Sequence, residues 1–119
     1  MKKNILIADD SLFIRLNLVG ILMDKYKVIE AEDGQSALLK FKKEKPDLVL
    51  LDIVMPGAEA EGLRVLEEMI KLDPNAKVIM LTAMRQDFVV EKCMKAGAKA
   101  YLVKPADAEH ILGAVEKFI

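Results

Sequence analysis

Apolar residues follow two alternating patterns along this chain. Short continuous runs, such as Ile5–Ala8 and Leu48–Leu51, are typical of strands buried on both faces of a parallel sheet. Longer stretches between these runs carry apolar residues at helical spacing. We predict strands at Asn4–Ala8, Lys27–Ala31, Leu48–Leu51, Val78–Leu81 and Ala100–Val103, and helices at Ser11–Lys25, Gln35–Glu44, Gly62–Leu72, Phe88–Ala96 and Asp107–Phe118. Five such strand–helix units with right-handed crossovers predict an α/β fold, a three-layer α/β/α sandwich around a five-stranded parallel sheet.

Four of the predicted strands end directly at polar residues whose side chains can bind a metal ion or a phosphate group. Asp9 and Asp10 follow the first strand, Asp52 the third, Thr82 the fourth and Lys104 the fifth. The carboxyl ends of parallel strands meet at one edge of a sheet, where ligands of such folds bind, so we expect these side chains to converge. Clustered carboxylates repel one another and favour a hard divalent cation, most simply Mg²⁺. An acidic pair at a strand end also serves as a helix N-cap, and Asp10 can fill both roles.

Composition narrows the class of protein. The 119 residues are 53% hydrophobic, which is enough to bury a core, so we expect one domain over residues 1–119 with no output domain after it. A net charge of −1 gives no reason to expect nucleic-acid binding. We expect no membrane insertion, because no apolar stretch is long enough to span a bilayer. The single cysteine, Cys93, excludes an internal disulfide and fits a cytoplasmic location.

Four motifs together resemble the receiver domain of the two-component response-regulator family. They read I-L-I-A-D-D-S at 5–11, L-V-L-L-D-I-V-M-P-G at 48–57, V-I-M-L-T-A at 78–83 and G-A-K-A-Y-L-V-K-P at 97–105. Their order and spacing cover essentially the whole chain. The resemblance implies a flavodoxin-like, doubly wound sheet with strand order 2-1-3-4-5. It also implies a phosphorelay signalling switch, not an enzyme with a separate substrate, although such a switch catalyses its own phosphorylation and dephosphorylation.

The resemblance assigns roles to the residues at the sheet edge. Asp52 becomes the phosphoryl acceptor, since a carboxylate can attack phosphorus and form an acyl phosphate. Asp10 becomes a direct Mg²⁺ ligand together with Asp52 and the backbone carbonyl of Val54, and Asp9 acts through a metal-bound water. Lys104 supplies a positive charge to the phosphoryl oxygens. The implied phosphoryl donor is a sensor histidine kinase or a histidine phosphotransfer protein, and the implied receiver of the signal is a downstream protein target.

Two further residues complete the implied switch. The hydroxyl of Thr82 would bond to the phosphoryl group, and the ring of Tyr101 would turn inward as Thr82 moves. The peptide bond between Lys104 and Pro105 is expected to be cis, as in the family. The sequence departs from the family in the loop at 57–62, which has two extra residues beside the expected acceptor.

Residues that two other functions require are missing from this sequence. A phosphatase of the haloacid-dehalogenase type needs a second acid two residues after its nucleophile, where this chain has Val54. A flavodoxin-like cofactor binder needs a phosphate-binding loop rich in Gly, Ser or Thr after the first strand, where Asp9 and Asp10 would repel phosphate. Within the receiver interpretation, a diffusible regulator, an intermediate of a phosphorelay and the receiver of a larger DNA-binding regulator all stay open.

The predicted helix at 11–25 is apolar on two sides. One stripe, assigned to the core by the resemblance, contains Ile14, Leu18, Ile21 and Leu22. The other contains Leu12, Leu16, Val19 and Met23 and is expected to face outward beside Asp52. An exposed apolar stripe usually marks a partner site, so we predict that it binds a helix pair of a partner or a second copy of this protein. The alternative is that the longer loop at 57–62 covers it.

Overall fold

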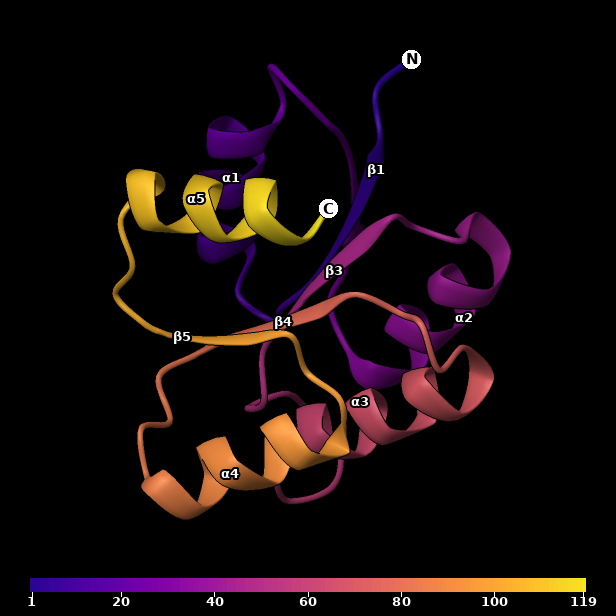
Figure 1. Ribbon diagram of the computed structural model, residues 1–119, viewed down its shortest axis with the longest axis vertical. Helices are drawn as coiled ribbons and strands as arrows, with labels where there is room; N and C mark the ends of the chain where they lie inside the picture. The colour runs from indigo at the N-terminus through magenta and orange to yellow at the C-terminus, as the bar shows by residue number, and fades with distance from the viewer.

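The computed structural model describes residues 1–119 and contains one sheet of five parallel strands (Figure 1). The sheet order is β2-β1-β3-β4-β5, which confirms the predicted order. Each strand except the two outer ones is paired on both sides, which explains why β1, β3 and β4 are apolar apart from Asn4 and Thr82 at two strand ends. The strands are β1 (Asn4–Ala8), β2 (Lys27–Ala31), β3 (Leu48–Leu51), β4 (Val78–Thr82) and β5 (Ala100–Val103).

Five helices cover the two faces of the sheet, with α1 and α5 on one side and α2, α3 and α4 on the other (Figure 1). Their bounds are α1 (Leu12–Leu22), α2 (Gly34–Glu44), α3 (Glu61–Leu72), α4 (Asp87–Ala96) and α5 (Ala108–Phe118). Successive residues of β1 alternate between the two layers: Ile5 and Ile7 pack beneath α1 and α5, whereas Leu6 and Ala8 pack against the other three helices. The three-layer sandwich is thus confirmed. None of the helices combines the length and apolarity that crossing a bilayer requires.

Helix α1 is shorter than predicted. It begins at Leu12, one residue after the predicted start, because the Ser11 hydroxyl accepts a hydrogen bond from the Ile14 backbone N–H and caps the helix. The expectation that Asp10 also serves as the N-cap was therefore wrong. The helix ends at Leu22, and the Leu22 carbonyl accepts hydrogen bonds from both Lys25 and Tyr26. This turn brings Lys27 back to the start of β1. The apolar spacing continues through Met23 and no Gly or Pro marks the end, so the sequence pattern extended the helix too far.

Other boundaries differ from the predictions by a single residue. Helix α2 begins at Gly34 because Asp33 and Ser36 cap each other reciprocally. Strand β4 continues to Thr82, which pairs with Val103 and accepts a hydrogen bond from the Lys104 backbone. Helices α3 and α4 each begin one residue before their predicted starts, whereas α5 follows its predicted N-cap, Asp107. The bond between Lys104 and Pro105 is cis, as predicted.

The first turn of α3 lies directly on the backbone that follows β3. A Cβ atom placed on Gly62 would meet the Asp52 carbonyl oxygen at 2.0 Å and the Ile53 Cα at 2.4 Å. The Gly62 N–H also donates to the Ile53 carbonyl at 2.9 Å. A residue with any side chain at position 62 would push these two segments apart, so Gly62 fixes where Asp52 sits relative to α3.

We therefore predict opposite effects for two Gly→Ala substitutions. Gly62→Ala should lower the free energy of unfolding by about 3 kcal/mol, because backbone atoms cannot move aside as a flexible side chain can. Gly113→Ala should raise it by about 0.5 to 1 kcal/mol, because Gly113 lies inside α5 and a Cβ there meets nothing within 4 Å. Urea unfolding followed by circular dichroism measures both. Equal effects of the two substitutions would show that the contact at Gly62 does not constrain the fold.

Candidate functional site

Three carboxylates gather at the carboxyl ends of β1 and β3. Asp9, Asp10 and Asp52 each offer an oxygen, and these oxygens lie within 4.8 Å of one another. Asp9 and Asp52 are 3% and 6% exposed, whereas Asp10 faces solvent. The cluster is therefore enclosed on the side of the sheet and open to solvent at Asp10, so a small ion can enter it.

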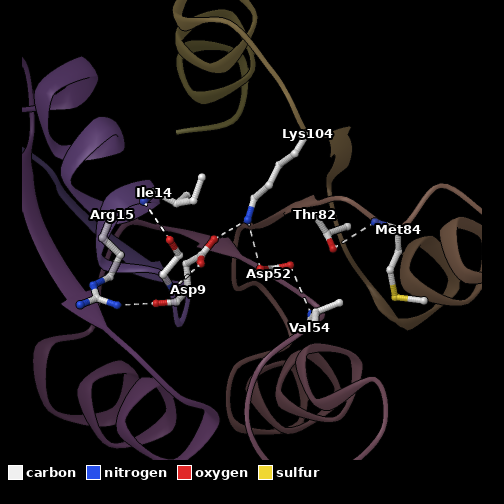
Figure 2. Close-up of polar contacts among 9 residues, drawn as sticks. Asp9, Ile14, Arg15, Asp52, Val54, Thr82, Met84 and Lys104 are labelled. Carbon is white, nitrogen blue, oxygen red and sulfur yellow. Dashed lines mark hydrogen bonds and ion pairs between the residues drawn. The ribbon is translucent and has the colours of Figure 1, made fainter.

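The ammonium group of Lys104 contacts two of the three carboxylates (Figure 2). Its Nζ lies 2.5 Å from Asp9 Oδ2 and 3.1 Å from Asp52 Oδ2. Burial by itself lowers the pKa of Lys104, but the hydrogen bond to Asp9 and the charges of Asp52 and Asp9 outweigh burial and raise the pKa above its ordinary value. Lys104 is thus charged throughout the physiological pH range and is aimed at the acceptor expected from the sequence.

Backbone amides hold the other oxygens of these carboxylates. The Ser11 N–H donates to Asp9 Oδ1 at 2.9 Å, and the Val54 N–H donates to Asp52 Oδ1 at 3.2 Å. Both donors belong to the residue two positions after the acid, so each loop orients its own carboxylate as it leaves the strand. The side chain of Val54 is exposed.

The donor set suits a hard divalent cation. Carboxylate oxygens are the ligands that Mg²⁺ prefers, and a Mg²⁺ site with few protein ligands completes its shell with water. Three carboxylates and one ammonium leave the cluster with two excess negative charges. A divalent cation at the open side would neutralise both of them.

Thr82 and Tyr101 are linked through a single residue, Met84. Thr82 is fully buried at the end of β4, and its Oγ1 accepts a hydrogen bond from the Met84 N–H at 3.4 Å. The Tyr101 hydroxyl donates to the Met84 carbonyl at 2.6 Å. Burial raises the pKa of Tyr101 to about 12, and the negative charge of Asp52 contributes to this shift. Figure 2 shows Thr82 beside Asp52 at the ends of neighbouring strands. Tyr101 lies on β5, where it pairs with Met80 of β4.

Arg15 is a site-adjacent residue whose burial the sequence analysis missed. It is only 9% exposed, and its Nη1 donates to the Asp9 carbonyl at 2.7 Å (Figure 2). Its Nε pairs with Glu30 on β2 at 3.1 Å. A signal was present: Arg15 lies three and seven residues before Leu18 and Leu22, on the core-facing side of α1.

Glu61 is a second residue that the sequence analysis missed. Its buried carboxylate receives two hydrogen bonds from Arg64, from Nε at 2.8 Å and from Nη2 at 2.9 Å. These bonds lower the pKa of Glu61 although burial opposes the shift. The same carboxylate touches the backbone of Gly34 and Gly57, where a Cβ would approach it to 2.5 and 2.9 Å. Glu61 therefore ties the longer loop to the start of α2.

The outward stripe of α1 is exposed, with one correction. Leu12, Leu16 and Met23 are more than half exposed, as predicted. The prediction for Val19 was wrong: it is half-buried and packs on the core beneath α1 and α5. Phe13, which was not assigned to the stripe, is 80% exposed. The alternative of a covering loop is also wrong, because these side chains are uncovered and Glu61 holds the loop on the α2 side.

Comparison with known proteins agrees with the motifs. Residues 5–116 match the family model of the response regulator receiver domain. The chain is 42% identical to the chemotaxis protein CheY of Thermotoga maritima over 98% of each chain, and 36% identical to the sporulation initiation phosphotransferase F of Bacillus subtilis over 100% of this chain and 95% of that one. It is also similar to a chain in the crystal structure of the CheX–CheY–BeF3–Mg complex from Borrelia burgdorferi, with a TM-score of 0.91, 36% identity, and coverage of 97% of this chain and 87% of that chain.

Lys104→Met should destabilise the protein in the absence of divalent cations. It leaves Asp9 and Asp52 buried without their counter-charge, and the expected loss is about 2 to 3 kcal/mol because the ammonium group keeps some contact with water. Adding MgCl2 should restore part of this loss, because a cation at the cluster replaces the missing charge. Thermal unfolding with and without MgCl2, at constant ionic strength, measures both effects.

The matched control is Lys25→Met, which breaks an exposed ion pair with Glu116. It should leave the free energy of unfolding close to that of the wild type, because water screens an exposed ion pair, and it should not alter the response to MgCl2. If Lys104→Met is as mild as this control, the contacts of Lys104 do not hold the cluster together.

Proposed function

This chain belongs to the response regulator receiver family, and on that premise we propose that residues 1–119 form one receiver domain that accepts a phosphoryl group on Asp52. The observation that carries the assignment is the contact of Lys104 with Asp52 beside an acidic cluster. This contact supports the proposal because an acceptor oxygen, an ammonium group for the phosphoryl oxygens and carboxylates able to hold a metal would then share one small volume.

The position of Asp52 in the sheet supports its choice as acceptor over Asp9 and Asp10. Strand β3 lies between β1 and β4, so Asp52 has the acidic pair on one side and Thr82 on the other. A phosphoryl group on Asp52 can therefore reach a metal held by the acids, the hydroxyl of Thr82 and the ammonium of Lys104. A group on Asp9 or Asp10, at the end of β1, lies one strand farther from Thr82.

Mg²⁺ is the proposed cofactor. Asp10, Asp52 and the Val54 carbonyl would hold it directly, and Asp9 would hold it through a water molecule. When bound, Mg²⁺ neutralises charge on the phosphoryl oxygens as the group moves to the acceptor. Residues of the chain orient the acceptor carboxylate: Lys104 contacts one oxygen of Asp52, and the Val54 N–H donates to the other.

The conformational signal is proposed to pass through Thr82 and Tyr101. A phosphoryl oxygen on Asp52 would accept a hydrogen bond from the Thr82 hydroxyl and draw it away from the Met84 N–H, whose present hydrogen bond to Thr82 is long at 3.4 Å. Movement of Met84 would then alter the acceptor of the Tyr101 hydroxyl. The domain would catalyse its own phosphorylation and dephosphorylation, and its output would be a change in partner binding.

We propose that the phosphoryl donor is a cytoplasmic sensor histidine kinase or a histidine phosphotransfer protein, and that the output is a downstream protein target. The exposed apolar residues of α1 support a docking role, either for the helix pair of a donor or for a second copy of this chain. Leu12, Phe13 and Leu16 lie in the first turns of α1, immediately after the acidic pair. A helical donor bound there would place its phosphoryl group at the open side of the cluster.

The test of the acceptor is labelling with acetyl phosphate. The wild type should gain one phosphoryl group by intact mass in MgCl2, and Asp52→Asn should gain none, since an amide oxygen is a far weaker nucleophile than a carboxylate. Wild type in EDTA should also stay unlabelled. Asp47→Asn is the control, because Asp47 lies at the opposite end of β3, and its labelling should be normal. Stoichiometric labelling of Asp52→Asn would refute the assignment.

The test of the docking surface compares two leucines with equal exposure. Leu16 on α1 and Leu39 on α2 are both 59% exposed, so each Leu→Glu substitution costs the fold little. Leu16→Glu should slow transfer from a phosphorylated histidine donor by about tenfold, because a charged group enters an apolar contact. Leu39→Glu should not slow this transfer, and both variants should react normally with acetyl phosphate. Stopped-flow transfer and light scattering, which also reports dimers, provide the readouts. Equal transfer rates and equal mass for all three proteins would exclude the surface.

A further inference from the structure

Arg15 holds the peptide group that joins the two acidic residues after β1. The Asp9 N–H still follows the strand and donates to Ala31, but the Asp9 carbonyl lies past the end of the pairing. Its partner is the Arg15 side chain, at 2.7 Å, in a buried environment. Because this carbonyl belongs to the peptide bond between Asp9 and Asp10, fixing it sets the direction in which both residues leave the strand.

The charge of Arg15 is neutralised away from the acidic cluster. Its Nε contacts Glu30 on β2, while its Nη1 contacts a carbonyl; it contacts none of the three clustered carboxylates. A guanidinium has several donors in one rigid plane, so it can bind the carbonyl and Glu30 at the same time. Arg15 can therefore hold the loop without competing with a cation for its ligands.

We propose that Arg15 is a positioning residue for the divalent-cation site, and that Glu30 keeps the Arg15 charge from opposing the cation. This inference rests on the proposed function, because it assigns the residues that prepare the Mg²⁺ ligands. Loss of Arg15 would leave a buried carbonyl without its hydrogen-bond partner and free the peptide group to rotate. The spacing of the Asp9 and Asp10 oxygens would then vary, and the cation would bind a less ordered ligand set.

A purely structural role for Arg15 is the competing explanation. A partly buried ion pair between α1 and β2 would affect stability if lost, whatever happens at the acidic cluster. The two roles differ in what they change. A structural role changes unfolding and leaves the affinity of the folded protein for Mg²⁺ as it was, whereas a positioning role changes that affinity.

The experiment is calorimetric titration of each folded, metal-free protein with MgCl2. Arg15→Gln should raise the Kd for Mg²⁺ by about tenfold, the lower end of the range for residues that orient metal ligands. Arg15→Lys should raise it less, because lysine can reach the carbonyl but cannot also keep the planar contact with Glu30. Glu30→Gln should also raise the Kd for Mg²⁺, because it leaves the charge of Arg15 unneutralised. This increase should become smaller as NaCl is added, because salt screens that charge. Leu22→Ala is the control, because it destabilises α1 from the core without touching the loop, and its Kd should equal that of the wild type.

The outcomes separate this inference from the function on which it rests. A wild-type protein that binds no Mg²⁺ refutes the proposed function, and the role of Arg15 with it. A wild-type protein that binds Mg²⁺ with the same Kd as Arg15→Gln refutes only the role of Arg15. Equal weakening in Arg15→Gln and Leu22→Ala also refutes it, since destabilisation alone would then be the cause. If Arg15→Gln does not fold, unchanged Kd values in both Arg15→Lys and Glu30→Gln refute it instead.

Discussion

The ammonium group of Lys104 connects parts of the chain that only the complete fold brings together. Lys104 follows β5, yet it contacts acids that follow β1 and β3, with β4 lying between. The contact to Asp9 spans 95 positions of sequence. Carboxylates as close as these repel each other when charged, and burial weakens the screening of that repulsion by water. The positive charge between them is what allows the folded domain to keep the buried carboxylates of Asp9 and Asp52 close together.

The outline of the fold and the edge where the site forms were predictable, because each rests on local pattern. Buried parallel strands are apolar throughout, and the residue after each strand necessarily reaches the same edge. Helical spacing could have indicated the burial of Arg15, but its ion pair with Glu30 was not predictable, since Glu30 comes from a strand that pairs with β1. Val19 was misplaced for a related reason. Helical spacing alone puts Val19 on the outward side of α1. In the fold, α5 packs against α1, and Val19 is partly buried against their shared core. Contacts between elements that are distant in sequence decide such cases.

The longer loop before α3 is accommodated by a small number of specific contacts. Glu61 lies close to Gly34 and Gly57 and is held by Arg64, so the loop at 57–62 lies against the start of α2. Ala60, in the left-handed backbone region, turns the chain into α3 without a side-chain cap. Gly62 then returns the helix to its close approach beside Asp52. The added length therefore changes the surface near α2 and leaves the approach from α1 open.

The two hydrogen bonds at Met84 have a thermodynamic consequence. Its N–H donates to Thr82 and its carbonyl accepts from Tyr101, so one short segment of backbone is shared by a residue at the end of β4 beside the site and a residue of β5. Any ligand that favours one arrangement of this segment must favour it at both ends, and the coupling free energy is the same in either direction. If phosphorylation changes the affinity of a protein for the surface around Tyr101 by some factor, binding of that protein changes the equilibrium between the phosphorylated and unphosphorylated forms by the same factor. The concentration of such a target protein would thereby contribute to how far the receiver is phosphorylated, in addition to reading that state.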